Sequence, residues 1–411
     1  MSQNAVAHPK SVLRGHRAAV HVTTFIKENE RLASGDADGF VVLWDLTIMR
    51  PRAVWQAHTN AILGICGWGD DKIITQGRDN KLIVWKITAK DEETLSIALP
   101  LDESTSERPQ PWILHILEIN TMNFCSFATC PAVPNTDYHT SDEILIAVPN
   151  TLASENIDIY QLPKQQRLLT ISFGDKTGKL GMAMALSLFW LAGRLHLVTG
   201  YENGQAIVYR RGRGDSWDCL YKSQAHSQPV LSLDVHSDKT HFFTSSADSL
   251  VVKHPIPNLN PLVGSAEIMP EDEPLKKINT KHAGQQGLRI RSDGRIFATA
   301  GWDSKIRVYS TKTMSELAVL KWHDVGCYAL AFAAITDSSK LASNDIKADS
   351  GNDGQVGTPN GNNFSKKETS LAVLTKLGEL SVKERRIKVA KEAHWLAAGS
   401  KDGKISLWDI Y

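Results

Sequence analysis

One short motif occurs at both ends of this chain and constrains its fold more than any other feature. Residues 13–16 read LRGH and are followed by LASGDADGFVVLWD, which ends at Trp44 and Asp45. The C-terminal stretch HWLAAGSKDGKISLWDIY carries the same ending at Trp408 and Asp409. In both copies, a tight turn with an aspartate precedes a strand-like segment that closes on Trp-Asp. A motif repeated from end to end predicts a repeat architecture, so the first functional question concerns a partner and not an active site.

Seven units emerge when the chain is aligned on the turn residue and on the aromatic residue six positions later. The pairs are Asp38/Trp44, Asp79/Trp85, Asn203/Tyr209, Asp248/His254, Asp303/Tyr309 and Asp402/Trp408, with a weaker copy at Ser154/Tyr160. Intervening strings such as FVVLW and KIRVY are β-branched and aromatic, as in strands. Most intervals between the aromatic residues are near the usual blade length of about 40–50 residues. The two long intervals indicate insertions in the third and last blades.

Most units also carry a small set of polar residues. A hydroxyl lies four residues before the turn position in five copies, namely Ser34, Thr75, Thr199, Thr244 and Thr299. A histidine lies upstream at His16, His58, His226, His282 and His323. Such a histidine can bridge the hydroxyl and the aspartate, while the indole N–H of a later Trp donates to the hydroxyl, so that each buried polar group has a partner.

We interpret these sets as structural hydrogen-bond networks, because a catalytic triad would not recur in blade after blade. The predicted sets are His16–Ser34–Asp38–Trp44, His58–Thr75–Asp79–Trp85 and His282–Thr299–Asp303. The chain contains no GxSxG, HExxH, phosphate-loop or dinucleotide-binding pattern. We therefore expect no catalytic residues, no cofactor and no metal site.

The repeats resemble the WD-repeat family, whose members are all-β propellers built from four-stranded blades. The resemblance implies a single seven-bladed propeller over residues 9–411, with blade aromatics near positions 44, 85, 160, 209, 254, 309 and 408. The last blade lacks an outer strand after Trp408, and residues 9–14 are available to provide it. We expect this N-terminal strand to close the ring, which would leave no exposed edge at the seam.

Composition excludes several classes of function. The net charge of +1 argues against a general nucleic-acid-binding surface, so no direct nucleic-acid binding is expected. Five scattered cysteines without a CxxC pair fit a reducing compartment. The N-terminus lacks the apolar core of a secretory signal, and no apolar run has transmembrane length, so no membrane association is expected. The most apolar stretch, LGMAMALSLFWLAG, is interpreted as a core strand.

The long interval before the last aromatic residue contains an unusual insertion. Of the 35 residues in 336–370, 23 are Gly, Asn, Asp, Ser, Thr or Pro, which predicts a disordered loop. Residues 377–393 follow with good helix formers and a basic stretch at 383–391, which predicts a short helix. This helix could bind a partner or carry a nuclear-import signal, but a solvated helix leading back into the sheet is the favoured interpretation.

Trp302 stands directly before a turn aspartate, at the tip of a tight turn on one rim of the ring. Its counterparts in other units include Arg78 and Lys401. Because Trp and Arg dominate interface hot spots, we hypothesise that Arg78, Trp302 and Lys401 help form a partner-binding face. The alternative is a Trp302 ring that lies flat against its own blade.

Several longer segments resemble one branch of the WD-repeat proteins. They include GDADGFVVLWDLTIMRP, AHTNAILGICGWGDDKIITQGRDNKLIVWKI, GQQGLRIRSDGRIFATAGWDSKIRVYS and KVAKEAHWLAAGSKDGKISLWDIY. Together these are similar to the fungal ASTRA-associated protein 1 family, itself similar to animal G-protein-β-like WD proteins. The resemblance implies a non-catalytic scaffold subunit of the ASTRA assembly, linked to chromatin remodelling. It also implies protein partners among the co-chaperones Tel2, Tti1 and Tti2, which help large phosphatidylinositol-3-kinase-like kinases to mature. Location in the nucleus is implied, with the cytoplasm left open as a second location.

Two other functions stay open at this point. A histone-tail reader would need an acidic or aromatic pocket at the ring centre, which the sequence does not exclude. A G-protein-β-like signalling subunit would need an N-terminal helix that coils with a γ partner. Only about a dozen residues without heptads precede the first Gly-His, so this function ranks lower.

Overall fold

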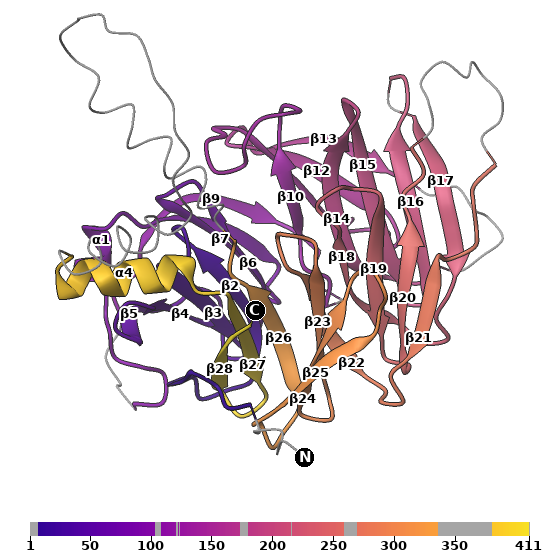
Figure 1. The fold of residues 1–411 in the computed structure, drawn as a ribbon. Coiled ribbons are helices and arrows are strands. Elements are labelled where there is room, and N and C mark those ends of the chain that lie inside the picture. Colours follow the sequence, from indigo (N-terminus) through magenta and orange to yellow (C-terminus); the bar gives the residue numbers. More distant parts are fainter. Residues whose placement is uncertain are drawn as a thin grey trace, which may run out of the picture.

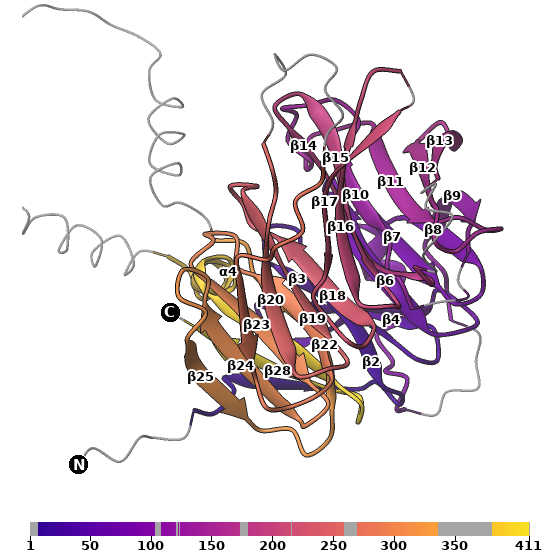
Figure 2. The ribbon, with the colours of Figure 1, turned by 90° about the vertical axis from the view of Figure 1, so that its right-hand side faces the viewer.

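The chain forms a seven-bladed propeller, as its repeats predicted (Figure 1). The computed structural model describes residues 7–410, except 103–107, 121, 123, 173–179, 215, 259–268 and 336–379. These residues form seven antiparallel four-stranded sheets, and Figure 2 shows them side by side in a turned view. The predicted disordered loop 336–370 lies outside the described residues, so its order stays a prediction.

The strands of the first four blades follow in chain order from the inner to the outer position. Blade 1 contains β2 (Val20–Ile26), β3 (Arg31–Asp36), β4 (Phe40–Asp45) and β5 (Arg50–Gln56). Blade 2 contains β6 (Ile62–Trp68), β7 (Lys72–Gly77), β8 (Lys81–Lys86) and β9 (Trp112–Glu118). Blade 3 contains β10 (Ala128–Pro131), β11 (Ile144–Pro149), β12 (Ile157–Leu162) and β13 (Gln166–Ile171). Blade 4 contains β14 (Ala183–Leu191), β15 (Arg194–Tyr201), β16 (Gln205–Arg211) and β17 (Trp217–Gln224).

Two further blades follow the same order, and the seventh borrows a strand from the N-terminus. Blade 5 contains β18 (Val230–Val235), β19 (His241–Ser246), β20 (Leu250–Pro255) and β21 (Lys276–Asn279). Blade 6 contains β22 (Gln285–Ile290), β23 (Ile296–Gly301), β24 (Lys305–Ser310) and β25 (Glu316–Lys321). Blade 7 contains β26 (Cys327–Phe332), β27 (Trp395–Ser400), β28 (Lys404–Asp409) and, outermost, β1 (Ser11–Arg14).

Strand β1 closes the ring as the sequence predicted. It pairs antiparallel with β28, placing Ser11 opposite Leu407 and Leu13 opposite Ile405. The first and last parts of the chain therefore share one sheet, and its edge at the seam is covered. The apolar stretch that was interpreted as a core strand forms β14, the inner strand of blade 4.

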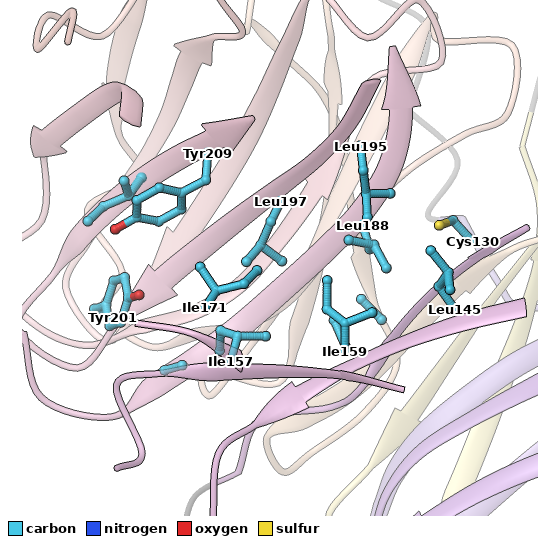
Figure 3. Packing of buried hydrophobic residues seen from close by; sticks show 14 of the residues in the cluster. Cys130, Leu145, Ile157, Ile159, Ile171, Leu188, Leu195, Leu197, Tyr201 and Tyr209 are labelled. Atoms are coloured by element: carbon cyan, nitrogen blue, oxygen red, sulfur yellow. The ribbon is translucent and has the colours of Figure 1, made fainter. Parts of the chain in front are cut away.

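The hydrophobic core lies between neighbouring blades. Trp55 of blade 1 and Trp85 of blade 2 meet edge to face with ring centroids 6.1 Å apart. Figure 3 shows a second such layer, in which Ile157 and Ile159 of blade 3 pack with Leu197 of blade 4. Burying a side chain of this size contributes about 1.5–3 kcal/mol, so packing between blades holds the ring together.

The structure corrects where the first long insertion lies. Strand β9 is the outer strand of blade 2, although the sequence placed this region in the third blade. The chain between β8 and β9 contains the short helix α1 (Asp91–Thr94). Its Glu92 is buried and accepts hydrogen bonds from Lys27 and Arg31 of blade 1. The inserted segment therefore packs on blade 1 before the chain returns to its own sheet.

The second insertion contains a short helix, α4 (Val382–Glu392), between β26 and β27, within the predicted range 377–393. The helix begins at Val382, later than predicted, because Ser381 caps it. Connections between the second and third strands of each blade lie on one rim, which we call the aspartate rim because it carries the turn aspartates. Connections between the first and second strands, including α4, lie on the opposite rim, which we call the hairpin rim. Within the described residues, no helix is long and apolar enough to span a membrane.

Candidate functional site

The polar set of blade 1 forms, but with a different aspartate from the one predicted. His16 bridges Ser34 and Asp36, with its Nε2 2.7 Å from Ser34 Oγ and its Nδ1 2.7 Å from Asp36 Oδ2. Trp44 Nε1 donates to Ser34 Oγ at 2.8 Å. The predicted member Asp38 is exposed at the turn, whereas Asp36 is fully buried. The assignment of Asp38 to this network was therefore wrong.

Which aspartate joins the network depends on the residue that ends the second strand of the blade. In blade 1 this position is Asp36, whose carboxylate also accepts the backbone N–H groups of Asp38 and Phe40 and so stabilises the turn. In blade 2 the same position is Gly77, where a Cβ would collide with the ring of His58. The carboxylate of blade 2 therefore has to come from Asp79 in the turn.

Blade 2 contains the predicted set in full. His58 Nδ1 lies 2.9 Å from Asp79 Oδ1, its Nε2 lies 2.8 Å from Thr75 Oγ1, and Trp85 Nε1 donates to Thr75 Oγ1 at 2.8 Å. Burial of the imidazole lowers the pKa of His58, which favours the neutral ring.

Blade 5 repeats this arrangement with His254 in place of the tryptophan. Thr244 Oγ1 lies 2.8 Å from His226 Nε2 and 2.7 Å from His254 Nε2. Asp248 Oδ1 lies 3.1 Å from His226 Nδ1. Recurrence of one network in several blades identifies it as part of the fold.

The structure changes the predicted set of blade 6. Thr299 Oγ1 donates to Gln285 Oε1 at 2.7 Å instead of pairing with a histidine. His282 is partly exposed, and its Nδ1 lies 3.5 Å from Asp303 Oδ2. Asp303 is instead held by Arg307 Nη2 at 2.6 Å. Gln285 and Arg307 thus take over the two bonds that the sequence assigned to His282.

Blade 7 contains a network residue that the sequence analysis missed. Ser406 Oγ lies 2.8 Å from His323 Nε2 and accepts a hydrogen bond from Trp408 Nε1 at 2.8 Å. Ala398, at the usual hydroxyl position, lies directly opposite Ser406 in the pairing of β27 with β28. Two cross-strand neighbours share one face of a sheet, so a hydroxyl on either strand can reach the same histidine. The serine two residues before Trp408 was the available signal.

The residue before each turn aspartate has a fixed place on the aspartate rim. Its backbone N–H donates to a carbonyl in the loop that enters the same blade; examples are Arg78 to Ala61, Trp302 to Gly284 and Lys401 to Gly326, each at 2.9 Å. Arg78, Trp302 and Lys401 therefore lie on the same rim, as the sequence predicted.

A cavity of about 490 Å³ opens at the centre of the aspartate rim. Its walls are mostly apolar and come from loops and inner strands of all the blades. The residues that dominate the lining are Leu63, Phe124, Met184, Leu231, Trp302 and Tyr328. Below it, the central channel narrows between the inner strands of the seven blades, with about 500 Å³ of free space. We call the apolar cavity on the aspartate rim the mouth of the channel. A cavity of this size can accept one or two large side chains of a bound peptide.

Trp302 forms part of the wall of this cavity, and its side chain is 47% exposed. The indole lies against the backbone of Gly284, where a Cβ would collide with the ring, and Nε1 donates to Gln286 Oε1 at 2.9 Å. Trp302 therefore packs against the loop of its own blade, and it still presents much of its surface to solvent. A tryptophan held in this way is a preorganised contact for a partner.

The two basic residues of the predicted face differ in their relation to the cavity. The guanidinium of Arg78 stacks over the ring of Phe124 at 4.5 Å, and Phe124 is a wall residue that is 55% exposed. Lys401 is exposed but is not among the lining residues. The structure thus brings Arg78 and Trp302 to the mouth and leaves Lys401 farther out on the rim. Phe124, which follows no repeat pattern, was not identified from the sequence.

The mouth and the channel contain a few titratable groups. His21 lies in the wall of the mouth, and burial lowers the pKa of its imidazole. Deeper in the channel, burial raises the pKa of Asp234, whose carboxylate accepts the backbone N–H of Ile290 at 2.7 Å. Among the described residues, His21 and Asp234 do not by themselves make up the set of nucleophile, base and oxyanion donors that acyl or phosphoryl transfer requires.

One group among the described residues has the composition of a metal site. It consists of His236, Asp238 and His241 at the turn between β18 and β19. However, the two imidazole rings are stacked, with centroids 4.3 Å apart and planes 25° apart. Nearly parallel rings direct their nitrogen lone pairs along parallel planes, which does not suit two ligands of one tetrahedral ion. The group is better explained by the hydrogen bonds of the turn, in which Asp238 accepts from Thr240.

Comparison with known proteins finds one family of relatives that match nearly the whole chain. The family model of ASTRA-associated protein 1 matches residues 9–408. A relative with that name from Verticillium alfalfae is 53% identical over 405 residues, covering 98% of this chain and 93% of the relative. The Pyricularia oryzae relative is 46% identical over 485 aligned positions, covering 98% and 97%. The Schizosaccharomyces pombe relative is 34% identical over 377, covering 83% and 98%.

Proposed function

The chain belongs to the ASTRA-associated protein 1 family, and we propose that it acts as a non-catalytic scaffold subunit of the ASTRA assembly that binds partner proteins through its aspartate rim. The family name and the propeller fold support an ASTRA-associated scaffold role. Loops on a rigid frame can hold several partners at once, which suits a scaffold.

The observation that carries the proposal is the apolar mouth of the central channel. Trp302 and Phe124 are 47% and 55% exposed, although both are large and apolar. Exposed aromatic residues around a hollow are typical of protein-binding sites, because burying them on association gains free energy without deforming the ring. Arg78, stacked on Phe124, adds donors at the edge of the same site.

The finer part of the proposal rests on the family resemblance. We place the scaffold in the nucleus, in chromatin remodelling and in the co-chaperone-assisted maturation of phosphatidylinositol-3-kinase-like kinases. Its direct partners would then be subunits of the ASTRA assembly, including the co-chaperones.

Affinity purification of the tagged full-length chain from its own cells, read by quantitative mass spectrometry, tests the proposal. We expect the wild-type chain to recover Tel2, Tti1, Tti2 and a large kinase. Trp302→Ala should reduce that recovery at least about tenfold, as expected for a hot-spot residue. Trp112→Ala is the matched control, because Trp112 is 75% exposed but lies on β9, the outer strand of blade 2.

Unchanged recovery with both Trp302→Ala and Phe124→Ala would exclude the mouth as the partner site. A second candidate function, a reader of modified histone tails, is favoured by one observation: Phe124, Trp302 and Tyr328 line the same cavity. Aromatic walls of this kind suit a methylated lysine through cation–π attraction. Recovery of histones without the co-chaperones would support this alternative.

A further inference from the structure

We propose that the outer face of helix α4, on the hairpin rim, is a second docking site, and that it binds an acidic segment of a partner protein that also carries aliphatic side chains. This site is separate from the mouth of the channel, because α4 is inserted between the first and second strands of blade 7. Figure 1 shows α4 in yellow, beside the strands of the first blade.

Helix α4 has a fixed position on the ring. Its last turn is tied to the connection between β2 and β3, where Lys391 Nζ lies 2.7 Å from Glu28 Oε2 and 3.0 Å from Glu30 Oε1. Asn29 Nδ2 also donates to the Lys391 carbonyl at 3.2 Å. At the other end, Ser381 and Glu384 form a capping box. The cap stabilises the first turn, and the contacts of the last turn fix the helix to blade 1, so that its outer face is preorganised and the entropic cost of binding is lowered.

The outer face is strongly basic and unneutralised. The helix contains five cations and two carboxylates, counted in VKERRIKVAKE. Lys391 is paired with blade 1, and Glu384 is occupied by the cap. Within the part of the chain that the structure describes, no carboxylate pairs with the remaining cations, which are Lys383, Arg385, Arg386 and Lys388. Lys388 lines the groove beside the ring, whereas Lys383, Arg385 and Arg386 are exposed. Two turns of unpaired positive charge attract an acidic partner.

The same face also carries apolar side chains. Val382 is 61% exposed and Val389 is 60% exposed, and they are seven residues apart, so they lie on one side of the helix with Arg386 between them. A valine–arginine–valine stripe fits a partner that alternates aliphatic and acidic groups. Nucleic acid offers phosphate but no aliphatic surface, so the stripe favours a protein.

The groove between α4 and the ring is not the site of the acidic contact. This groove of about 970 Å³ is lined on the helix side by Leu380 and Ile387 together with charged residues of both signs. Two of its lysines, Lys27 and Lys391, are already paired with carboxylates. Its other wall includes the exposed carboxylates of Asp70 and Asp137, which would repel an acidic segment. The geometry therefore directs the partner to the outer face.

Fluorescence anisotropy with the full chain tests the proposal. The probe is a labelled 18-residue helical peptide in which leucine and glutamate alternate along one face. We expect saturable binding that weakens with added salt, because surface charges are screened over about 10 Å at 0.1 M ionic strength. Lys383→Glu/Arg386→Glu should weaken binding at least about tenfold. Lys277→Glu/Lys281→Glu, at exposed lysines of blade 5, is the matched control and should leave binding unchanged.

Control variants and competing probes distinguish the possible outcomes of this experiment. Trp302→Ala should leave peptide binding intact, so failure of the mouth and failure of α4 can be told apart. Circular dichroism and melting temperatures should match wild type for each variant, because the changed side chains are exposed. The proposal is overturned if a lysine version of the peptide binds equally well, if a 20-base-pair DNA duplex binds more tightly than the acidic peptide, or if binding appears only after residues 345–370 are removed.

Discussion

The side chain of Asn29 makes two hydrogen bonds to the backbone of Ala334. Asn29 Nδ2 donates to the Ala334 carbonyl at 2.7 Å, and Asn29 Oδ1 accepts from the Ala334 N–H at 3.0 Å. Because Nδ2 also donates to the Lys391 carbonyl, one buried amide in blade 1 holds both ends of the blade 7 insertion. The backbone of Asn29 is left-handed, with φ of 68°, a conformation that asparagine tolerates better than most residues.

Asn29→Gly should release the insertion. Glycine keeps the left-handed backbone but removes three hydrogen bonds, so the free energy of unfolding should fall by about 1–3 kcal/mol. Hydrogen exchange of α4 should accelerate markedly. Asn135→Gly is the control, because Asn135 has φ of 61° at an exposed position. Unaltered exchange in α4 would show that Asn29 does not hold the insertion.

Substitution of Asp36 and of Asp38 separates the observed network from the one that the sequence predicted. Asp36→Asn should lower the free energy of unfolding by about 1–3 kcal/mol, because a buried carboxylate that binds His16 and two backbone N–H groups is lost. Asp38→Asn should change it by less than about 0.5 kcal/mol, since Asp38 is exposed. Urea unfolding measures both, and the reverse order of effects would contradict the structure.

The hydroxyl of blade 7 should be transferable between strands. Ser406→Ala should cost about 1–3 kcal/mol, because His323 and Trp408 both lose a partner. Adding Ala398→Ser should restore part of the loss, since residues 398 and 406 are cross-strand neighbours on one face. Equal stability of the single and double variants, measured by chemical denaturation, would exclude this exchange.

Acidification should destabilise the ring before its carboxylates become protonated. Burial lowers the pKa of His323 and of His196 to about 4. Both have the ordinary value near 6.5 in the unfolded chain. As the pH falls, the unfolded state takes up these protons first. The stabilisation is therefore complete above about pH 6.5 and is lost progressively toward pH 4, by up to roughly 3 kcal/mol for each histidine.

Urea unfolding at pH 7.5, 6.0 and 5.0 measures this loss. Asp248 and Asp402 have lowered pKa values in the folded ring despite the opposing effect of burial, because of hydrogen bonds that include those of His226 to Asp248 and of Lys404 to Asp402. The contribution of these two carboxylates to the free energy of unfolding is therefore lost only below this pH range. A free energy of unfolding that is constant from pH 7.5 to 5.0 would contradict the assignment of these histidines as buried and neutral.

Gly284 should control the position of Trp302 at the mouth. The backbone of Gly284 has φ of 76°, and a Cβ there would collide with the indole. Gly284→Ala should therefore lower stability by more than about 1 kcal/mol and weaken partner recovery as Trp302→Ala does. Gly193→Ala is the control, because its φ is 72° and its Cβ would meet open space, so it should share the backbone cost and keep partner binding.

Much of the fold could be predicted from the sequence because the information is local and repeated. The spacing from turn aspartate to aromatic residue encodes the same hairpin in unit after unit, and residues 9–14 were the available outer strand for the last blade. Strand β9 was misplaced because the chain leaves blade 2 after β8, packs α1 on blade 1, and only then returns. No local pattern marks such a return, since it depends on contacts with a different blade.

The sequence by itself determined that this chain is a seven-bladed ring of one family, with the turn positions 78, 302 and 401 on a single rim. Only the tertiary structure decided that Asp36 and not Asp38 holds His16, that Ser406 replaces the hydroxyl missing at Ala398, and that Phe124 joins Trp302 at the mouth. The physical reason is that a side chain's partner depends on strand register and on which loops converge at the channel. Both are set by the packing of blades that lie far apart in the sequence.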